Sequence, residues 1–119
     1  MRDFKKLQVW EKAHKLALEI YRISSSFPNE ELFSLTSQLR RSAVSVPSNI
    51  AEGCGRGGSK ELARFCAIAA GSASELEYQL LLAYDLGYIC DSTYSTSNKS
   101  VIEIKKMLNA FIKRLSSDS

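Results

Sequence analysis

The sequence predicts an all-α protein, an antiparallel up-down-up-down four-helix bundle with a proline-kinked second helix, formed as one domain over residues 1–119. Apolar residues recur every three or four positions in four long segments, which is the spacing of one face of an amphipathic helix. Short stretches rich in serine, glycine or proline separate these segments, and no stretch alternates as a β-strand does. Four such helices with short connections pack best as an antiparallel bundle. A chain of this length can bury about 65% of its unfolded surface in one core.

The first helix is expected from about Lys6 to Ser25. Its inner face is predicted to comprise Trp10, Ala13, Ala17, Ile20 and Tyr21. At this spacing Trp10 is interpreted as a core anchor in preference to a base-stacking platform, and His14 as a surface residue. The serines before Phe27, and Pro28 itself, end the helix, because a residue that precedes proline is held extended. A short turn at residues 30–32 then leads to the second helix.

The second helix is expected from a cap at Ser34 to about Gly53. Its inner line is predicted to comprise Leu35, Leu39, Ser42, Val46 and Asn49. Pro47 lies within this helix, where it removes a backbone donor and crowds the carbonyl group of Ala43, at a cost of roughly 3 kcal/mol. We therefore expect a kink, with the Ser45 or Asn49 side chain bonded to the freed backbone groups.

Four glycines are predicted to end the second helix and to make the connection flexible. They are Gly53, Gly55, Gly57 and Gly58. The next residues, Ser59 and Lys60, begin a helix, so the stretch suggests a phosphate-binding loop; the spacing of a nucleotide-binding P-loop and a preceding strand are both missing. A tight connection capped by Ser59 is the interpretation we prefer, with attraction of a lone phosphate to the helix terminus as the alternative.

The third helix is expected from about Lys60 to Leu86. Its inner face is predicted to comprise Leu62, Phe65, Ala69, Ala73, Leu76, Leu80 and Ala83. Small side chains over residues 67–74 favour a close approach of the second helix, where Asn49 would pair with a serine hydroxyl or with Glu75. A second apolar line indicates a contact with another subunit. This line contains Ile68, Tyr78, Leu81, Leu82 and Tyr84.

The fourth helix is expected from Ser92 or Thr93 to Leu115, after a helix C-cap at Gly87. Its inner face is predicted to comprise Val101, Ile104, Leu108, Phe111, Ile112 and Leu115. Residues 93–100 are polar and weakly helical, so the start of this helix is the least defined boundary. Residues 116–119 are expected to fray.

The run Gln-Leu-Arg-Arg-Ser-Ala at residues 38–43, followed by Ser-Val-Pro-Ser-Asn-Ile-Ala-Glu-Gly at residues 45–53, resembles the 23S rRNA intervening-sequence proteins, a family of small bacterial four-helix-bundle proteins. The resemblance extends to Leu7, Val9, Trp10, Ala13, Ile20, Tyr21, Phe27, Pro28, Arg64, Phe65, Glu77, Leu86, Gly87 and Tyr88. It marks as motif residues Pro47, Asn49, Glu52, Gly53, Gly71, Ser72 and Glu75.

This resemblance implies a helical bundle and a homopentamer, and the family has no agreed biochemical activity. Accessory proteins of diversity-generating retroelements are similar in architecture. The resemblance therefore implies RNA or DNA, or a protein such as a reverse transcriptase, as a partner.

Composition sets bounds on location and chemistry. Hydrophobic residues make up 45% of the chain and charged residues 24%, as in ordinary globular proteins. There is no apolar run of the roughly 20 residues that cross a bilayer, and no signal peptide is recognised, so we expect a cytoplasmic protein without a membrane partner. The three cysteines form no close pair, so no metal or cofactor is expected. Cys66 and Cys90 are predicted to be buried, and Cys54 to be exposed.

Basic residues cluster around the second connection. They are Arg40, Arg41, Arg56, Lys60 and Arg64. If these residues share one rim, they can bind phosphates with little sequence preference. The alternative is that Arg40 or Arg41 pairs with Glu52 or Glu75 while the others are simply solvated. A second basic region is interpreted as an exposed helix face. It contains Lys105, Lys106, Lys113 and Arg114.

The pattern does not favour an enzyme. Glu75 and Glu77 are two residues apart and face different ways on a helix, so they are no general acid–base pair, and no catalytic residue is assigned. The Glu-x-x-His elements of di-metal bundles are missing. Two functions follow as hypotheses. The first is an oligomeric module that binds the backbone of structured RNA or DNA; the alternative is a protein-interaction scaffold with no nucleic-acid ligand.

Overall fold

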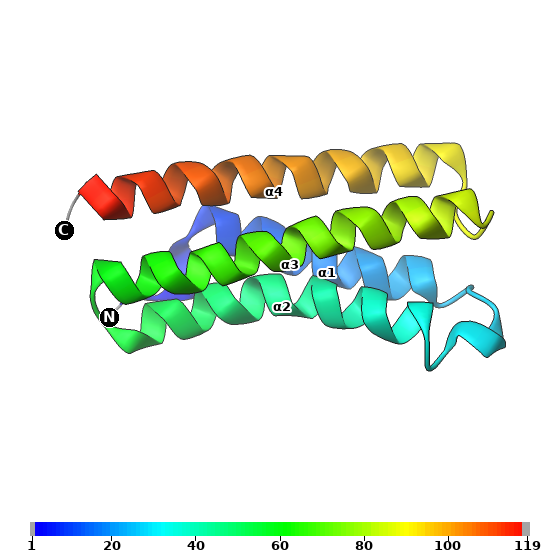
Figure 1. Ribbon diagram of the computed structural model, residues 1–119, viewed down its shortest axis with the longest axis horizontal. Helices are drawn as coiled ribbons and strands as arrows, with labels where there is room; N and C mark the ends of the chain where they lie inside the picture. The colour runs from blue at the N-terminus through cyan, green and yellow to red at the C-terminus, as the bar shows by residue number, and fades with distance from the viewer. Residues whose placement is uncertain (1, 118–119) are drawn as a thin grey trace.

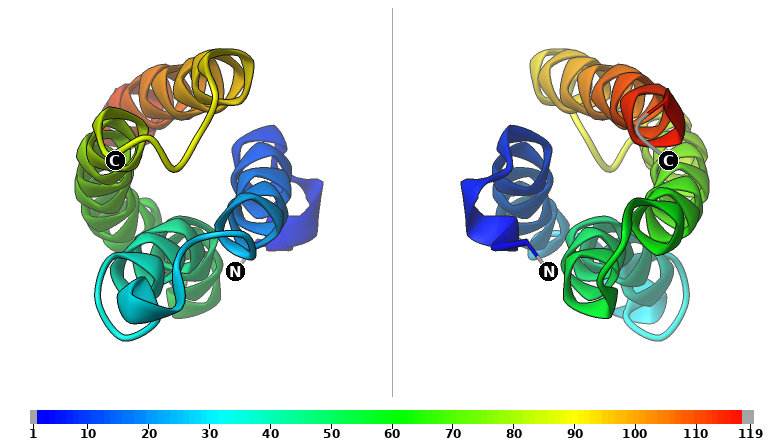
Figure 2. Two further views of the ribbon diagram at one scale, coloured as in Figure 1. Left: turned by 90° about the vertical axis from the view of Figure 1, so that its right-hand side faces the viewer. Right: turned by 90° about the vertical axis from the view of Figure 1, so that its left-hand side faces the viewer.

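The computed structural model describes residues 2–117 and confirms the predicted four-helix fold (Figure 1). The elements are a 3₁₀ helix η1 (Phe4–Lys6), α1 (Gln8–Ser24), a second 3₁₀ turn η2 (Asn29–Glu31), α2 (Leu35–Arg56), α3 (Ser59–Asp85) and α4 (Asp91–Ser117). Consecutive long helices run antiparallel and pack against each other. Seen end-on, they surround the core in the order α1, α2, α3, α4 (Figure 2).

The helix ends differ from the predicted ones in three places. The second helix continues through Gly53 to Arg56, since only Gly57 and Gly58 have the positive φ angles that end it. The third helix is preceded by Gly58 and has no side-chain cap, so the predicted capping role of Ser59 is wrong. The fourth helix reaches Ser117, two residues beyond its predicted end, and residues 118–119 of the stretch expected to fray lie outside the described residues.

The two helix caps predicted at Ser34 and Gly87 have different outcomes. Ser34 precedes α2 as expected, but its side chain makes no cap; the Glu31 carboxylate instead accepts a hydrogen bond from the Leu35 amide at 3.4 Å. The predicted C-cap at Gly87 is confirmed. Its φ is 82°, its amide donates to the Tyr84 carbonyl group, and the Tyr88 amide donates to that of Ala83, each at 2.9 Å, which is a Schellman motif.

The core lies along the four inner faces. All seven residues predicted to face inward from α3 are buried, as are five of the six from α4, where Ile112 is half-buried. On α1 the face is rotated from the predicted one. Val9 and Leu16 are buried there, whereas Trp10 is only partly buried and Tyr21 is 47% exposed. Two adjacent apolar lines run along α1, and the positions of α2 and α4 decide which one is covered.

The α2–α3 contact is the most extensive in the bundle, as the small residues of both helices predicted. A Cβ atom added at Gly53 would lie 2.8 Å from the Cβ atom of Phe65 and 2.9 Å from Cδ1 of Leu62. Gly53 therefore does not end the helix; it allows α3 to cross closely. Pro47 is buried within α2, which is continuous through it (Figure 1), and the kink stays a prediction.

Both chain ends lie at the same end of the bundle as the α2–α3 connection (Figure 1). The Arg2 amide donates a hydrogen bond to the Cys54 carbonyl group at 3.1 Å, which ties the N-terminal segment to the end of α2. Among the described residues, no helix is long and apolar enough to cross a membrane.

Candidate nucleic-acid interface

The connection between α2 and α3 carries three of the five predicted phosphate-binding residues. Arg56 ends α2, two glycines with positive φ turn the chain, and Lys60 and Arg64 lie in the first two turns of α3. All three side chains are exposed. The structure therefore brings Arg56, Lys60 and Arg64 together on one surface.

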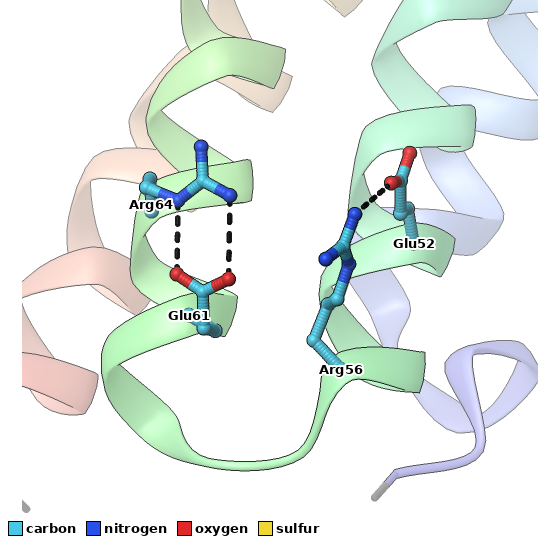
Figure 3. A network of polar contacts seen from close by, with 4 residues as sticks. All are labelled: Glu52, Arg56, Glu61 and Arg64. Atoms are coloured by element: carbon cyan, nitrogen blue, oxygen red, sulfur yellow. Dashed lines mark hydrogen bonds and ion pairs between the residues drawn. The ribbon is translucent and has the colours of Figure 1, made fainter.

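Both arginines at this connection form ion pairs within their own helices (Figure 3). Arg56 donates to Glu52 at 2.9 Å, and Arg64 donates to the two oxygens of Glu61 at 2.9 and 3.2 Å. The hydrogen bond from Arg64 lowers the pKa of the Glu61 carboxyl group below its usual value. Exposed pairs of this kind contribute little to stability because solvent screens them, so a phosphate group can replace the carboxylates at small cost.

Phe65 lies between these two arginines. The guanidinium carbon of Arg56 is 5.1 Å from the centre of the Phe65 ring, and that of Arg64 is 4.5 Å from it. A ring beneath a guanidinium group restricts its position through cation–π attraction while the N–H donors at its edge stay available. Lys60 makes no ion pair among the described residues, so its charge is free for a ligand.

Two further arginines reach this end of the bundle through the tertiary structure. The guanidinium carbons of Arg2 and Arg114 lie 5.7 and 5.4 Å from the centre of the Phe111 ring. No local pattern marks Arg2 as a site residue, and Arg114 belongs by sequence to a separate basic region, because only folding brings these two residues to the end of the bundle that carries the α2–α3 connection. We call this surface the basic end; its residues are Arg2, Arg56, Lys60, Arg64 and Arg114.

Arg40 and Arg41 do not belong to the basic end. Sixteen residues separate Arg40 from Arg56, which is about 24 Å along a helix. Arg40 donates to the Ser24 hydroxyl at 2.8 Å, and its guanidinium carbon lies 4.8 Å from the centre of the Tyr21 ring. The expectation of one shared rim is therefore wrong for this pair. The alternative pairing with Glu52 or Glu75 is also wrong, because Arg41 is exposed without a partner among the described residues.

The motif residues Ser72 and Glu75 belong to a polar seam between α2 and α3. The Ser42 hydroxyl lies 2.7 Å from Oε1 of the buried Gln79 and 3.2 Å from a carboxylate oxygen of Glu75. One turn along, the hydroxyl groups of Ser45 and Ser72 are 2.7 Å apart. These contacts satisfy polar groups inside a close helix crossing, which gives them a structural role.

The Asn49 side chain bonds within its own helix. Its amide nitrogen donates to the Ser45 carbonyl group at 2.8 Å and lies 3.0 Å from the Ser45 hydroxyl. A serine hydroxyl is therefore its neighbour, as predicted, but the predicted bond to the backbone group freed by Pro47, the Ala43 carbonyl, is not the one that Asn49 makes. The predicted alternative, pairing with Glu75, is wrong, since Glu75 contacts Ser42 instead.

The predicted exposure is wrong for two of the three cysteines. Cys66 is buried as expected, and burial raises the pKa of its thiol to about 11. Cys54 is buried, not exposed, because α2 continues past it; Cys90 is exposed, not buried, because it lies in the turn before α4. Among the described residues, no group of three histidine, cysteine or carboxylate side chains is placed to hold a metal ion.

Cys90 is expected to be the thiol that reacts in the native protein. Hydrogen bonding with the Ser92 and Thr93 side chains lowers the pKa of its thiol to about 7, and the thiolate is the nucleophile. Alkylation by iodoacetamide should therefore accelerate roughly tenfold between about pH 6 and 8 and then level off. Mass spectrometry of labelled peptides measures this rate. Replacing Cys90 by serine should abolish native labelling, and a rate that keeps rising above pH 9 would contradict the assignment.

The fold and the basic end together define a small all-helical bundle protein with a positively charged end and a polar α2–α3 seam. A family model described as 23S rRNA-intervening sequence protein matches residues 5–110. The chain belongs to this family, as the resemblance indicated.

A crystal structure of a protein of unknown function from the S23 ribosomal protein family of Bacteroides thetaiotaomicron VPI-5482 is similar to this chain. The two are 30% identical in sequence, the match covers 88% of this chain and 98% of that one, and the TM-score is 0.81. No curated protein of known function matches the sequence.

Proposed function

We propose that this protein binds the sugar–phosphate backbone of structured RNA or DNA through the basic end, as a homo-oligomer and without catalysing a reaction. The observation that carries the proposal is the gathering of five exposed cationic side chains from three separate segments at one end of the bundle. The family's description, which refers to the intervening sequences of 23S rRNA, supports a nucleic-acid ligand.

The chemistry of the basic end suits phosphate better than base edges. Arg56 and Arg64 are oriented over Phe65, and Lys60 offers an unpaired ammonium group beside them. Among the described residues, the carboxylates of Asp3, Glu52 and Glu61 lie at the same end, and the last two are already neutralised by the arginines. Such a surface attracts a polyanion electrostatically and reads shape more than sequence.

A salt titration tests this function directly. We expect an RNA hairpin and a DNA duplex of equal length, each carrying a fluorophore, to bind with affinity that falls as salt rises. Each neutralised phosphate contributes about −0.9 to the slope of log K against log salt for duplex DNA, so five contacts predict a slope of about −4. Fluorescence anisotropy measures it. A slope near zero, or no binding of either probe at low salt, would refute the proposal.

A protein-interaction scaffold is the second candidate. It is favoured by the connection between α1 and α2, where Phe33 is 93% exposed and Leu32 is 47% exposed. Exposed apolar side chains of this size indicate contact with a protein; a reverse transcriptase is one partner of this kind. The two functions are separated by purification with and without a high-salt wash. Nucleic acid that co-purifies and is removed by salt, seen in the ratio of absorbance at 260 and 280 nm, supports the first; a protein retained through the wash supports the second.

A further inference from the structure

One outer face of α3 is apolar although no other element of the chain covers it. Ile68, Tyr78 and Leu81 are 43%, 61% and 41% exposed. At 100° per residue they share one side of the helix with Gly71, Glu75 and Asp85. We call this surface the α3 face; its residues are Ile68, Gly71, Glu75, Tyr78, Leu81 and Asp85.

Gly71 in the middle of the α3 face has no role within the single chain. A Cβ atom added there would meet nothing within 4 Å, and the backbone has no positive φ. Gly53 differs, since α3 presses against it. Glycine weakens a helix interior relative to alanine, so an unneeded glycine beside three exposed apolar side chains indicates close approach by another molecule.

A groove between α1 and α2 is the counterpart of the α3 face. Its volume is about 380 Å³. Its lining is mainly apolar and includes Trp10, Leu18, Tyr21, Val44 and Pro47. Leu18 and Tyr21 are about half exposed, at 52% and 47%. From Trp10 to Tyr21 the groove follows α1 for about 17 Å, and the α3 face from Ile68 to Leu81 is about 20 Å long.

The charges beside the two surfaces are complementary. Arg40 lies over the ring of Tyr21, which lines the groove, and Arg41 follows it on α2; neither has a carboxylate partner among the described residues. On the α3 face, Glu75 contacts only the Ser42 hydroxyl, and Asp85 makes no ion pair within the same residues. Because Ser42 follows Arg41 directly, Glu75 lies at the same level of the bundle as Arg41. Two copies placed side by side with parallel axes would bring these opposite charges together.

We propose that the α3 face of one copy docks into the α1–α2 groove of a second copy. The inference rests on the proposed self-association and names the surfaces that meet. Each copy then uses two different surfaces, so the contact is heterologous and closes into a ring when the rotation between copies allows it. It also gives Arg40 and Arg41 a role in assembly, apart from the basic end.

Cross-linking between two variants that each carry one exposed cysteine tests the docking, since Cys54 and Cys66 are buried. In a Cys90→Ser background, one variant carries Val44→Cys in the groove and the other Ser74→Cys beside the α3 face. The contact between Ser45 and Ser72 places these positions at one level. A short bismaleimide should link the variants to each other in a mixture, while each variant alone stays unlinked.

Light scattering during size-exclusion chromatography distinguishes a failure of self-association from a failure of the docking alone. A monomer at all concentrations would overturn both self-association and the docking. An oligomer without the mixed cross-link, or with equal linking of each variant to itself, would overturn the docking alone. Neither result depends on nucleic-acid binding.

Substitutions on the α3 face provide a second readout. Tyr78→Glu and Gly71→Gln should raise the dissociation constant of the oligomer roughly tenfold or more, while far-ultraviolet circular dichroism shows unchanged helicity. The matched control is Asn109→Gln on the exposed side of α4, which should assemble as the native chain does. An unchanged dissociation constant for both α3 variants would overturn the docking.

Discussion

Replacing Gly53 by alanine is expected to destabilise the bundle by about 1–3 kcal/mol, because the added methyl group overpacks the α2–α3 crossing. The new Cβ atom would lie 2.8 Å from the Phe65 Cβ atom, 2.9 Å from Leu62 Cδ1 and 3.3 Å from the Leu62 Cα atom. Two of these three neighbours are fixed closely to the backbone, so the helices themselves must move apart. Gly53→Leu should cost more still.

Gly55 is the matched control for this prediction. It lies in the same helix two residues later, and a Cβ atom there would meet nothing within 4 Å. Gly55→Ala should therefore stabilise the helix by about 0.5–1 kcal/mol. Thermal unfolding at one protein concentration compares the two, and a shift of about 4 °C per kcal/mol is expected for a chain of this size. Equal shifts in the same direction would show that the crossing is looser than the structure indicates.

Reversing the charge of Arg56, Lys60 and Arg64 to glutamate should weaken binding to a structured RNA or DNA probe by about 10²–10³-fold at roughly 0.1 M salt. The estimate assumes the loss of three phosphate contacts. The slope of log K against log salt should become less steep by about 2 to 3. The two ion pairs that are lost are exposed, so the helical content should be unchanged.

Two control variants make this experiment specific to the basic end. A triple variant with Lys15, Lys99 and Lys106 changed to glutamate has the same net charge, but its substitutions lie on exposed surfaces of α1 and α4, and its affinity should fall much less. Replacing Arg40 and Arg41 by glutamine should leave the slope of log K against log salt unaltered when it is measured on the assembled oligomer. If the basic-end variant and the lysine variant lose equal affinity, binding depends on overall charge and not on this site.

Local patterns in the sequence were enough to predict the four helices and most of the inner faces. The spacing of apolar residues predicts the inner faces of α3 and α4 well, because all of the predicted residues on α3 and all but Ile112 on α4 are buried. On α1, Tyr21 and Trp10 continue a second apolar line, so spacing alone predicted a face that is rotated from the buried one, although Ala13, Ala17 and Ile20 are buried as expected. The exposure of Cys54 and Cys90 also depends on helix ends, which local patterns locate only to within a few residues.

The candidate site could be predicted only in part. Arg56, Lys60 and Arg64 are close in the sequence and flank a turn, so their proximity follows from the connection itself. Arg40 and Arg41 belong to the same helix as Arg56. That helix is 22 residues long, so they lie in the other half of the bundle. Arg2 and Arg114 lie near opposite ends of the chain and meet at Phe111 only after folding.

The sequence by itself therefore determined the number of helices, the antiparallel bundle, the close α2–α3 crossing and the family, because these depend on hydrophobic periodicity and on motif residues within single segments. Only the tertiary structure decided which cations share the basic end, which of two apolar lines on α1 is buried, and which face of α3 stays uncovered. These properties depend on how the helices are rotated and stacked against each other. That arrangement is set by side-chain packing between distant segments, which no local pattern encodes.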